Sequence, residues 1–538
     1  MQRMKNKFVI WSLLVLMASS VLAVPAYRGL LTHVQSDGSK ITLYQHGDEC
    51  FSYFTNEAGQ WLQADEKGDF RIVPAMSDEQ IAMRRAESRY ANSALRRAAS
   101  ETGIDRTLSP RGPVILVNFA DTKFSSTNAQ MTEWAMGSNY SYNGATGSIH
   151  QYFKDVSYGE YDLQLDVFGP VTVSKNFAYY GGDYSTNYRD TCADKLVVEA
   201  CQQAIKAGAD FSQYDDDKDG YVDWVVIIYA GKGQADGGVA STIWPHQYDL
   251  HYYGSAFKLN GKTIDHYCML CELNGQTGER AGIGTFVHEF SHIMGLPDLY
   301  ETTGQGNWKT SGMWDVMDYG PYNHDGNTPP AYSAYERWFM GWLSPTLLNQ
   351  AATPTLLDLN TTRSAAYINS QGEAISNILD PNPTQFYILE NRQQSGWDAY
   401  IPGHGLLITR INYRSTWWGN NSVNNSKSNL GVDIIEADGV APTYVKGDRE
   451  NGYFGKLTDA YPAGATTFTA VPAYQITNIT EADKKITFDL NGGGESTILQ
   501  AIEHVTSQQQ SNIKWLRNGL IIIQRGNDLY DISGKRIN

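Results

Sequence analysis

The residues with the most informative chemistry lie near the middle of the chain, in the segment His288-Glu289-Phe290-Ser291-His292-Ile293-Met294-Gly295-Leu296-Pro297-Asp298. Two histidines four residues apart share one face of a helix, so both imidazoles can reach one metal ion with Glu289 beside them. Gly295 can adopt the left-handed conformation that ends a helix, and Pro297 cannot continue one. The chain can then turn and bring Asp298 to the same ion. Three protein ligands leave one position of a zinc ion open, as a catalytic site requires.

A second group of possible ligands is acidic. The segment Asp215-Asp216-Asp217-Lys218-Asp219-Gly220-Tyr221-Val222-Asp223 matches a calcium-loop pattern, with carboxylates at loop positions 1, 3, 5 and 9. The predicted calcium ligands are Asp215, Asp217, Asp219, the carbonyl of Tyr221, and Asp223. Position 12 is Val226 instead of the glutamate of an EF-hand, and a strand pattern follows. We predict a structural calcium loop, because clustered carboxylates repel one another without a cation. The alternative is a solvated acidic turn.

The segment Gly312-Met313-Trp314-Asp315-Val316-Met317-Asp318-Tyr319-Gly320 resembles the methionine turn beneath the metal of metzincin proteases. The spacing of Gly295 and Asp298 after His292 also resembles the metzincin ligand loop, with aspartate in place of the third histidine. In that reading Met317 forms the floor of the metal site. Tyr319 is placed like the tyrosine that in some metzincins moves between the zinc and the tetrahedral intermediate. The alternative for Met317 is an ordinary core methionine in a turn.

These parts predict peptide-bond hydrolysis by a zinc-activated water. Zinc, held by His288, His292 and Asp298, would polarise the scissile carbonyl and lower the pKa of its water towards about 7. Glu289 cannot reach the zinc from its helix position, so it is predicted to accept the proton of that water and deliver it to the leaving amine. The phenol of Tyr319 would help to stabilise the oxyanion.

The composition restricts the class of partner and the destination of the chain. With 538 residues the chain needs several domains, and a net charge of −16 argues against nucleic acid or an anionic membrane as a partner. Residues 1–23 carry basic residues, a short apolar run and small residues up to Ala23, which is typical of a signal peptide. No later stretch is apolar enough to span a membrane. We therefore expect a secreted or cell-surface-associated protein, and a monomer.

The elements that must position the motifs fall into successive regions. Residues 24–108 read as short strands followed by a charged helical run at 76–100, which predicts a propeptide. Residues 109–345 mix strands and helices and hold both metal motifs, which predicts an α+β catalytic domain. Within it we expect strands at 114–119, 161–173 and 224–229, and helices at 189–206, 281–295 and 330–340.

The sequence predicts β structure for the remainder of the chain. Strand patterns at 385–389, 405–411, 432–435 and 486–490 predict that residues 346–492 form an all-β, sandwich-like domain. Residues 493–538 are predicted to be a linker and a short tail of strands. The cysteines of the pair Cys268 and Cys271 are expected to be either disulfide-bonded or free and buried, because a zinc ribbon or redox motif would need more context.

Taken together, these motifs resemble a known family, the secreted zinc metalloproteases of the immune inhibitor A type. The resemblance covers roughly residues 109–492. It is carried by the GxxxHExxHxxGxPDLY block from Gly284 to Tyr300, by WDVMDYG, by YDDDKDGYVDWVVIIYAG and by LENRQQSGWDAYIPGHGLLI. It implies a metzincin-like fold, catalytic zinc, calcium at the acidic loop, activation by removal of an N-terminal propeptide, and protein substrates. The segment 529–537 is similar to short tails on exported proteins of some Gram-negative bacteria.

Two alternatives remain open from the sequence. A thermolysin-like protease would use a downstream glutamate such as Glu336 as the third zinc ligand, although the GxxD spacing and the methionine turn argue against it. A catalytically idle surface protein would use a calcium-stabilised scaffold to bind other molecules. The intact Glu289 argues against that second alternative.

Overall fold

The computed structural model describes residues 23–48, 51–65, 68–77, 79–81, 83–85, 109–182, 190, 192–238, 241–303, 308–443, 452–499, 513–517, 520–525, 528–531 and 536–537. The chain divides into two compact units, Met1–Gln500 and Ala501–Asn538. The predicted signal peptide, apart from Ala23, lies outside the described residues, as does most of the charged helical run. In the described part of the chain, no helix is long and apolar enough to cross a membrane.

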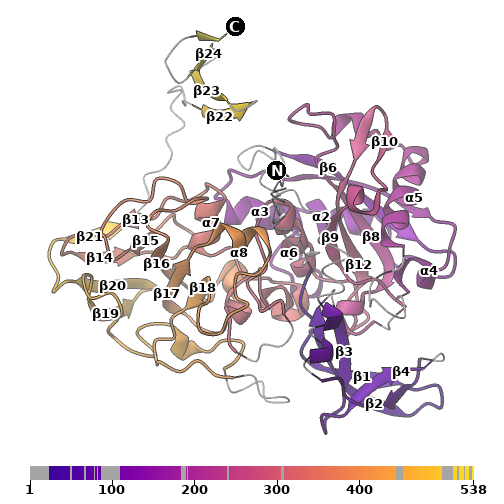
Figure 1. Cartoon of the computed structure of the whole chain (residues 1–538), viewed down its shortest axis with the longest axis horizontal. Helices are drawn as coiled ribbons and strands as arrows, with labels where there is room; N and C mark the ends of the chain where they lie inside the picture. Colours follow the sequence, from indigo (N-terminus) through magenta and orange to yellow (C-terminus); the bar gives the residue numbers. More distant parts are fainter. Residues whose placement is uncertain are drawn as a thin grey trace, which may run out of the picture. The chain divides into compact units, whose positions relative to one another are not determined.

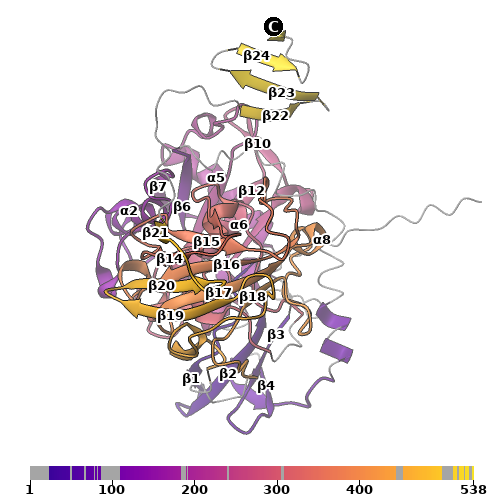
Figure 2. The same cartoon turned by 90° about the vertical axis from the view of Figure 1, so that its left-hand side faces the viewer.

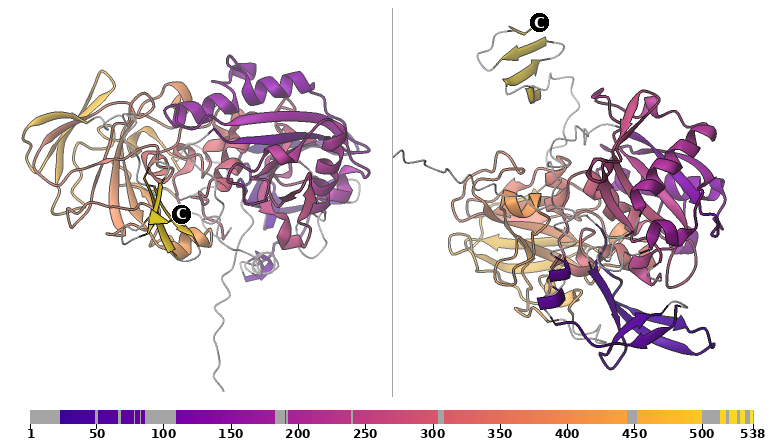
Figure 3. Two further views of the ribbon diagram at one scale, coloured as in Figure 1. Left: turned by 90° about the horizontal axis from the view of Figure 1, so that it is seen from above. Right: turned by 45° about the vertical axis from the view of Figure 1, so that its right-hand side comes forward.

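An antiparallel sheet follows the start of the described chain (indigo in Figure 3). It is formed by β1 (Leu30–Val34), β2 (Lys40–Asp48), β3 (Phe51–Thr55), β4 (Trp61–Ala64) and β5 (Phe70–Ile72). Each strand pairs with the next along the chain, because short turn-rich segments connect them. Leu31, Leu43, Leu62 and Phe70 form its small core. The short strands predicted for this region are therefore present.

The central sheet of the first unit has the strand order β7-β6-β8-β12-β9 (Figure 1). Its strands are β6 (Arg111–Asn118), β7 (Gln164–Thr172), β8 (Val225–Lys232), β9 (His246–Asp249) and β12 (His266–Leu273). All neighbours are parallel except β9, which pairs antiparallel with β12 at the edge. The continuous apolar runs of β6 and β8 are buried on both faces, as parallel strands between helices must be.

Helices cover both faces of this sheet. They are α2 (Asn128–Met136), α3 (Ile149–Val156), α4 (Phe177–Gly181), α5 (Ala193–Lys206) and α6 (Gly284–Ile293). Helix α7 (Ala334–Phe339) follows them and packs through Tyr335 and Trp338 on Phe386 of the C-terminal β structure. Alternate residues of β6 and β8 share one core with α5, and Figure 1 shows α6 on the opposite side of the sheet. The hairpin of β10 (Phe257–Leu259) and β11 (Lys262–Ile264) precedes β12.

The last helix of this region begins later than predicted. The sequence favoured a start at Pro330, but α7 begins at Ala334. Ser333 accepts a hydrogen bond from the N–H of Glu336, and the Glu336 carboxylate accepts one from the N–H of Ser333. This capping box satisfies N–H groups that have no partner within the helix, so it determines where the helix starts.

The C-terminal part of the first unit is formed by two sheets, seen together in Figure 2. One sheet contains β13 (Thr346–Leu347), β15 (Ala365–Ile368), β16 (Gln385–Arg392), β17 (Gly405–Asn412) and β18 (Val432–Ile434). The other contains β19 (Ile476–Ala482), β20 (Lys485–Leu490), β14 (Thr353–Leu356) and β21 (Ser496–Leu499). Apolar side chains from both sheets form one core. Strand β21 lies in the segment that the sequence assigned to a linker; it pairs with β14, so the sheet extends to Leu499. The short helix α8 (Ser415–Gly419) lies between β17 and β18.

The second unit contains the strands predicted for the tail. They are β22 (Ile513–Arg517), β23 (Leu520–Arg525), β24 (Asp528–Asp531) and β25 (Arg536–Ile537), each paired antiparallel with the next. In the first unit, the four cysteines that the structure describes, Cys192, Cys201, Cys268 and Cys271, are free and buried. Of the two possibilities left open for Cys268 and Cys271, the structure therefore has the free thiols.

Candidate active site

The two histidines of α6 and the aspartate after it converge on one point. His288 Nε2 and His292 Nε2 are 3.0 Å apart, and Asp298 Oδ1 lies 3.1 Å from the first and 3.3 Å from the second. The three residues are 0%, 1% and 0% exposed. A tetrahedral zinc ion with ligands at about 2.0–2.1 Å would separate its ligand atoms by about 3.3 Å. The observed spacing therefore fits one zinc ion.

The hydrogen bonds on the far side of each imidazole determine which nitrogen faces the site. His288 Nδ1 lies 2.8 Å from the carbonyl oxygen of Val316, and His292 Nδ1 lies 2.8 Å from that of Leu296. A carbonyl only accepts, so each Nδ1 carries the proton and each Nε2 presents a lone pair. Asp298 Oδ1 has no hydrogen-bond donor among the described residues. Buried acceptors that face one another in this way are stabilised by a cation, and imidazole with carboxylate is a zinc ligand set.

The end of α6 is shaped as the sequence predicted. Gly295 has a φ of 97°, the left-handed conformation that glycine adopts without steric cost. The N–H of Leu296 then donates to the carbonyl of Ser291, which closes the helix. Burial lowers the pKa of His292 below its usual value of 6.5, which favours the neutral form that binds metal.

Glu289 points at a peptide segment from the N-terminal part of the chain. Its Oε1 accepts a hydrogen bond of 2.9 Å from the backbone N–H of Val24, and both groups are buried. Val24 packs with Ala23 and Ala26 against Ala235 and Trp244. The segment 23–28 therefore lies across the site at the residue that the sequence predicts to be the general base.

Three aromatic side chains that were not predicted as site residues hold the backbone of this segment. Tyr300 donates its hydroxyl to the carbonyl of Ala23 at 2.6 Å, Trp244 donates its indole N–H to that of Val24 at 3.1 Å, and Tyr322 donates to that of Pro25 at 2.6 Å. Donors aimed at successive backbone carbonyls bind a peptide whatever its side chains are. Tyr300 lies just after Asp298, and Tyr322 lies just after the predicted methionine turn, so their closeness to these motifs could have identified them as site residues. Trp244 is far from both motifs in the sequence.

The methionine turn lies directly behind the first histidine. Met317 is fully buried, its N–H donates to Asp315 at 2.8 Å, and its carbonyl accepts from the N–H of Leu299 at 2.8 Å. Because the carbonyl of the neighbouring Val316 accepts a hydrogen bond from His288, this turn orients the His288 imidazole. Tyr319 is 4% exposed and packs edge-to-face on Phe454, with the Arg28 guanidinium 5.2 Å from its ring centroid.

Glu336 does not join the two histidines. One of its oxygens caps α7, and its pKa is raised well above its usual value by burial and by the neighbouring Asp315 carboxylate. Since Asp298 lies at the histidines and Glu336 does not, the structure contradicts the thermolysin-like alternative.

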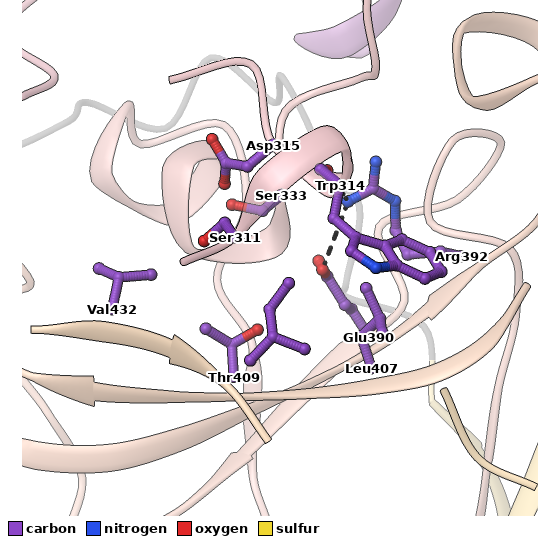
Figure 4. A pocket seen from close by; sticks show the side chains of 10 residues that line it. Ser311, Trp314, Asp315, Ser333, Glu390, Arg392, Leu407, Thr409 and Val432 are labelled. Carbon is purple, nitrogen blue, oxygen red and sulfur yellow. Dashed lines mark hydrogen bonds and ion pairs between the residues drawn. The ribbon is translucent and has the colours of Figure 1, made fainter. Parts of the chain in front are cut away.

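A small pocket lies beside this region, between Trp314 and Asp315 on one side and Glu390, Arg392 and Thr409 of the β strands on the other (Figure 4).

The acidic loop is only partly assembled as predicted. Asp215, Asp217 and Asp223 come together closely enough to share an ion, but Asp219 is not part of this group. Asp219 instead accepts a hydrogen bond of 2.8 Å from the N–H of Tyr221. As predicted, a strand and not a helix follows the loop, namely β8.

The charges in the acidic loop are partly compensated by a lysine. The Lys262 ammonium, on β11, forms an ion pair with Asp215 Oδ2. Burial would raise the pKa of Asp215, but the contact with Lys262 holds it below its usual value. Burial and the adjacent carboxylates raise the pKa of Asp223 to about 7. The remaining carboxylates therefore still favour a cation, and oxygen ligands suit calcium.

The buried histidine pair, the aspartate after it and the adjacent glutamate match the HExxH pattern of zinc metallopeptidases. Residues 122–343 match the family described as immune inhibitor A peptidase M6, catalytic domain. This part of the chain, of mixed α and β content, is therefore similar to the catalytic domain of that metalloprotease family.

Two relatives share the same sequence identity with this chain over their matched regions. The chain is 29% identical over 238 residues to the pre-pro-metalloprotease PrtV of Vibrio cholerae serotype O1 strain M66-2, which covers 38% of this chain and 25% of PrtV. It is 29% identical over 228 residues to Immune inhibitor A of Bacillus thuringiensis subsp. alesti, covering 36% of this chain and 31% of the relative. The chain thus spans about a quarter to a third of the length of these relatives.

Proposed function

We propose that this protein is a secreted zinc endopeptidase that is made as an inactive precursor. The observation that carries the proposal is the Glu289 carboxylate, which lies one residue from a buried zinc-ligand set and accepts a hydrogen bond from a bound peptide backbone. A peptidase needs this pairing of a base with a peptide-binding cleft beside a metal. A zinc ion bound by His288, His292 and Asp298 would supply Lewis-acid chemistry.

Each residue of the site has a proposed task. Glu289 takes a proton from the attacking water and later gives it to the leaving amine. Tyr300, Tyr322 and Trp244 orient the substrate backbone through its carbonyls. Met317 and its neighbours support the histidines, and Tyr319 stabilises the oxyanion after Arg28 has left its ring. The proposed organisation is a metzincin-like catalytic domain at residues 109–345, followed by a β-sandwich-like domain at 346–492.

The N-terminal region is proposed to be a propeptide, residues 24–108, that follows a signal peptide, residues 1–23. Residues 24–28 of this propeptide occupy the place that a substrate needs, so the catalytic residues are inaccessible until they leave. Further contacts support the docking of this region: Gln45 donates to the carbonyl of Gln234 at 2.6 Å, and Arg85 donates to that of Thr302 at 3.0 Å. The name of the Vibrio relative, a pre-pro-metalloprotease, agrees with this organisation.

Calcium at Asp215, Asp217 and Asp223 is proposed as a structural ion that steadies the start of β8. The proposed substrates are proteins or peptides, and nucleic acid is not a partner. The proposed location is outside the cell or at its surface, and residues 493–538 are proposed as a linker and a short tail for sorting or attachment. The proposed functional form is a monomer.

The function is tested by cleavage of casein before and after limited proteolysis of the full chain. The expected result is hydrolysis only after the N-terminal region is removed, abolished by a chelator and restored by zinc. The variant Glu289→Ala, processed by the same external protease, should bind zinc and cleave nothing. If processed wild type binds zinc and leaves casein intact, the binding-protein alternative is correct and our proposal is wrong.

The latency of the precursor is tested by changing Tyr322, whose hydroxyl donates to the carbonyl of Pro25. Tyr322→Phe removes one hydrogen bond of segment 23–28, and such a bond contributes about 0.5–1.5 kcal/mol. Because Tyr322 is also proposed to bind substrate, activity before processing is divided by activity after processing, and we expect this ratio to be about two- to tenfold higher in the variant than in wild type. Tyr413→Phe removes an equally short hydroxyl-to-carbonyl bond of 2.6 Å, to Leu379 in the β region, and is the matched control. Equal effects of the two variants would contradict a role of the segment in latency.

A further inference from the structure

An asparagine cluster from the β region reaches the segment that follows α6. We define it as Asn421, Asn424 and Asn425, which lie between α8 and β18. Asn424 donates to the carbonyl of Leu299 at 2.7 Å, and Asn425 accepts from the N–H of Thr302 at 2.8 Å. These partners are more than a hundred residues away in the sequence. The cluster thus fixes the backbone directly after the third zinc ligand.

Asn421 contacts the third zinc ligand itself. Its Oδ1 accepts a hydrogen bond of 2.7 Å from the N–H of Asp298, and its Nδ2 donates one of 2.5 Å to Asp298 Oδ2. One carboxamide therefore holds both the backbone and the carboxylate of Asp298. Because Oδ2 is engaged, Oδ1 is the oxygen left to face the histidines.

The environment of Asn421 favours a dedicated role over a surface contact. The residue is 2% exposed, and Asp298 is 0% exposed. Its backbone has a φ of 50°, a left-handed conformation that costs most residues energy but that asparagine tolerates. Strained backbone of this kind persists where the surroundings hold it, often at functional sites. Here it carries the carboxamide to the aspartate.

We propose that Asn421 is a positioning residue of the zinc site, supplied to the catalytic domain by the region that follows it. It fixes the rotamer of Asp298 so that Oδ1 completes the ligand set with His288 and His292. Partners behind metal ligands orient those ligands, and their loss lowers metal affinity about 10- to 100-fold. The inference rests on the proposed zinc site and gives the β region a part in it.

This arrangement also explains why aspartate can serve as the third ligand. A carboxylate has two equivalent oxygens and rotates about its last bond, whereas an imidazole presents a single directed lone pair. With one oxygen held by Asn421, the carboxylate presents one directed oxygen as well. The two histidines are oriented from behind by the carbonyls of Val316 and Leu296, and Asn421 does the same for Asp298.

The test compares variants of the full chain with wild type in their zinc affinity and in the coordination environment of the bound metal. Asn421→Gly removes the carboxamide and tolerates the left-handed backbone, so it adds no strain. Asn421→Asp keeps the oxygen that accepts from the Asp298 N–H, but it replaces the donor Nδ2 by a carboxylate oxygen that faces Asp298 Oδ2. The control is Asn391→Ala: Asn391 is also fully buried in the β region and donates to the carbonyls of Leu356 and Lys484, away from the zinc ligands.

Zinc dissociation constants are measured by competition with a chromophoric chelator, and visible spectra are recorded with cobalt in place of zinc. We expect Asn421→Gly and Asn421→Asp to weaken zinc binding about 10- to 100-fold and to alter the cobalt spectrum, with Asn391→Ala close to wild type in both. Circular dichroism selects the folded variants; if Asn421→Gly does not fold, Asn421→Asp decides. A folded Asn421 variant with wild-type affinity and spectrum would overturn the inference, and wild type that binds no zinc would instead refute the proposed function.

Discussion

The zinc site and the acidic loop are both groups of possible metal ligands, but they are built differently. His288, His292 and Asp298 are at most 1% exposed, and each is oriented by a hydrogen bond from behind. The acidic loop is largely exposed, its Asp215 already pairs with Lys262, and its Asp219 points elsewhere. The first site is preorganised around a single ion, whereas the second has to compete with a lysine and with water.

This difference predicts separate consequences for the two metals. A preorganised, buried ligand set binds its ion tightly, and its loss removes the chemistry. A partly exposed loop binds its ion more weakly, and its loss reduces stability.

Replacing the third ligand should have the largest effect. Asp298→Ala removes the carboxylate from the histidine pair, so we expect zinc content after dialysis to fall from one ion per chain to almost none. The matched change is Glu336→Gln, which keeps an acceptor for the cap of α7 and should retain zinc. Elemental analysis of the two purified variants decides; loss of zinc from Glu336→Gln alone would contradict the assignment.

Replacing the general base should separate chemistry from metal binding. In Glu289→Ala, zinc content should stay at the wild-type value while the turnover number of the processed enzyme falls by about 10²- to 10⁴-fold. The rate is measured with a quenched fluorescent peptide. A variant with near wild-type turnover would show that another group takes the proton.

Calcium should stabilise the protein in a pH-dependent way. The folded-state pKa of Asp223 is about 7, above the usual 3.8, so the metal-free protein loses stability from this group as the pH rises between those values. Calcium needs the ionised carboxylates and should restore that stability. We expect calcium to raise the melting temperature by a few degrees at pH 8 and by less at pH 5, measured by calorimetry. Asp223→Asn should remove the effect of calcium at both pH values.

The smallest effect is expected from the competing lysine. Lys262→Met removes the ammonium from Asp215, so calcium affinity should rise about two- to fivefold, the range that a partly exposed ion pair can contribute. Titration calorimetry measures it. Lys258→Met, on the neighbouring strand β10, is the control and should change nothing. An unchanged affinity in Lys262→Met would mean that the lysine does not compete with the ion.

The sequence predicted those features that depend on residues close together in the chain. The ligand spacing in α6, the left-handed Gly295 and the strand after the acidic loop all follow from local conformational preferences, and the structure agrees. The start of α7 was predicted too early, because proline is favoured in the first turn of a helix and Pro329-Pro330 precedes the capping box of Ser333 and Glu336 that sets the start.

The features that the sequence did not predict depend on long-range packing. Asn421 lies 123 residues beyond Asp298, and Lys262 is 47 residues beyond Asp215. The indole N–H of Trp244 donates to the carbonyl of Val24, 220 residues earlier in the sequence. No periodicity or spacing links such pairs, because only the tertiary fold brings them together. For the third ligand, the GxxD spacing and the methionine turn favoured Asp298, but Glu336 stayed open as an alternative because either residue can supply the required oxygen.

The central claim is that one zinc ion lies between His288, His292 and Asp298. The most direct test is anomalous diffraction from crystals of the full chain, recorded on either side of the zinc absorption edge. We predict one strong peak at about 2.0–2.2 Å from both Nε2 atoms and from Asp298 Oδ1. A crystal grown with zinc that shows no peak there, or a peak bound by Glu336, would contradict the claim.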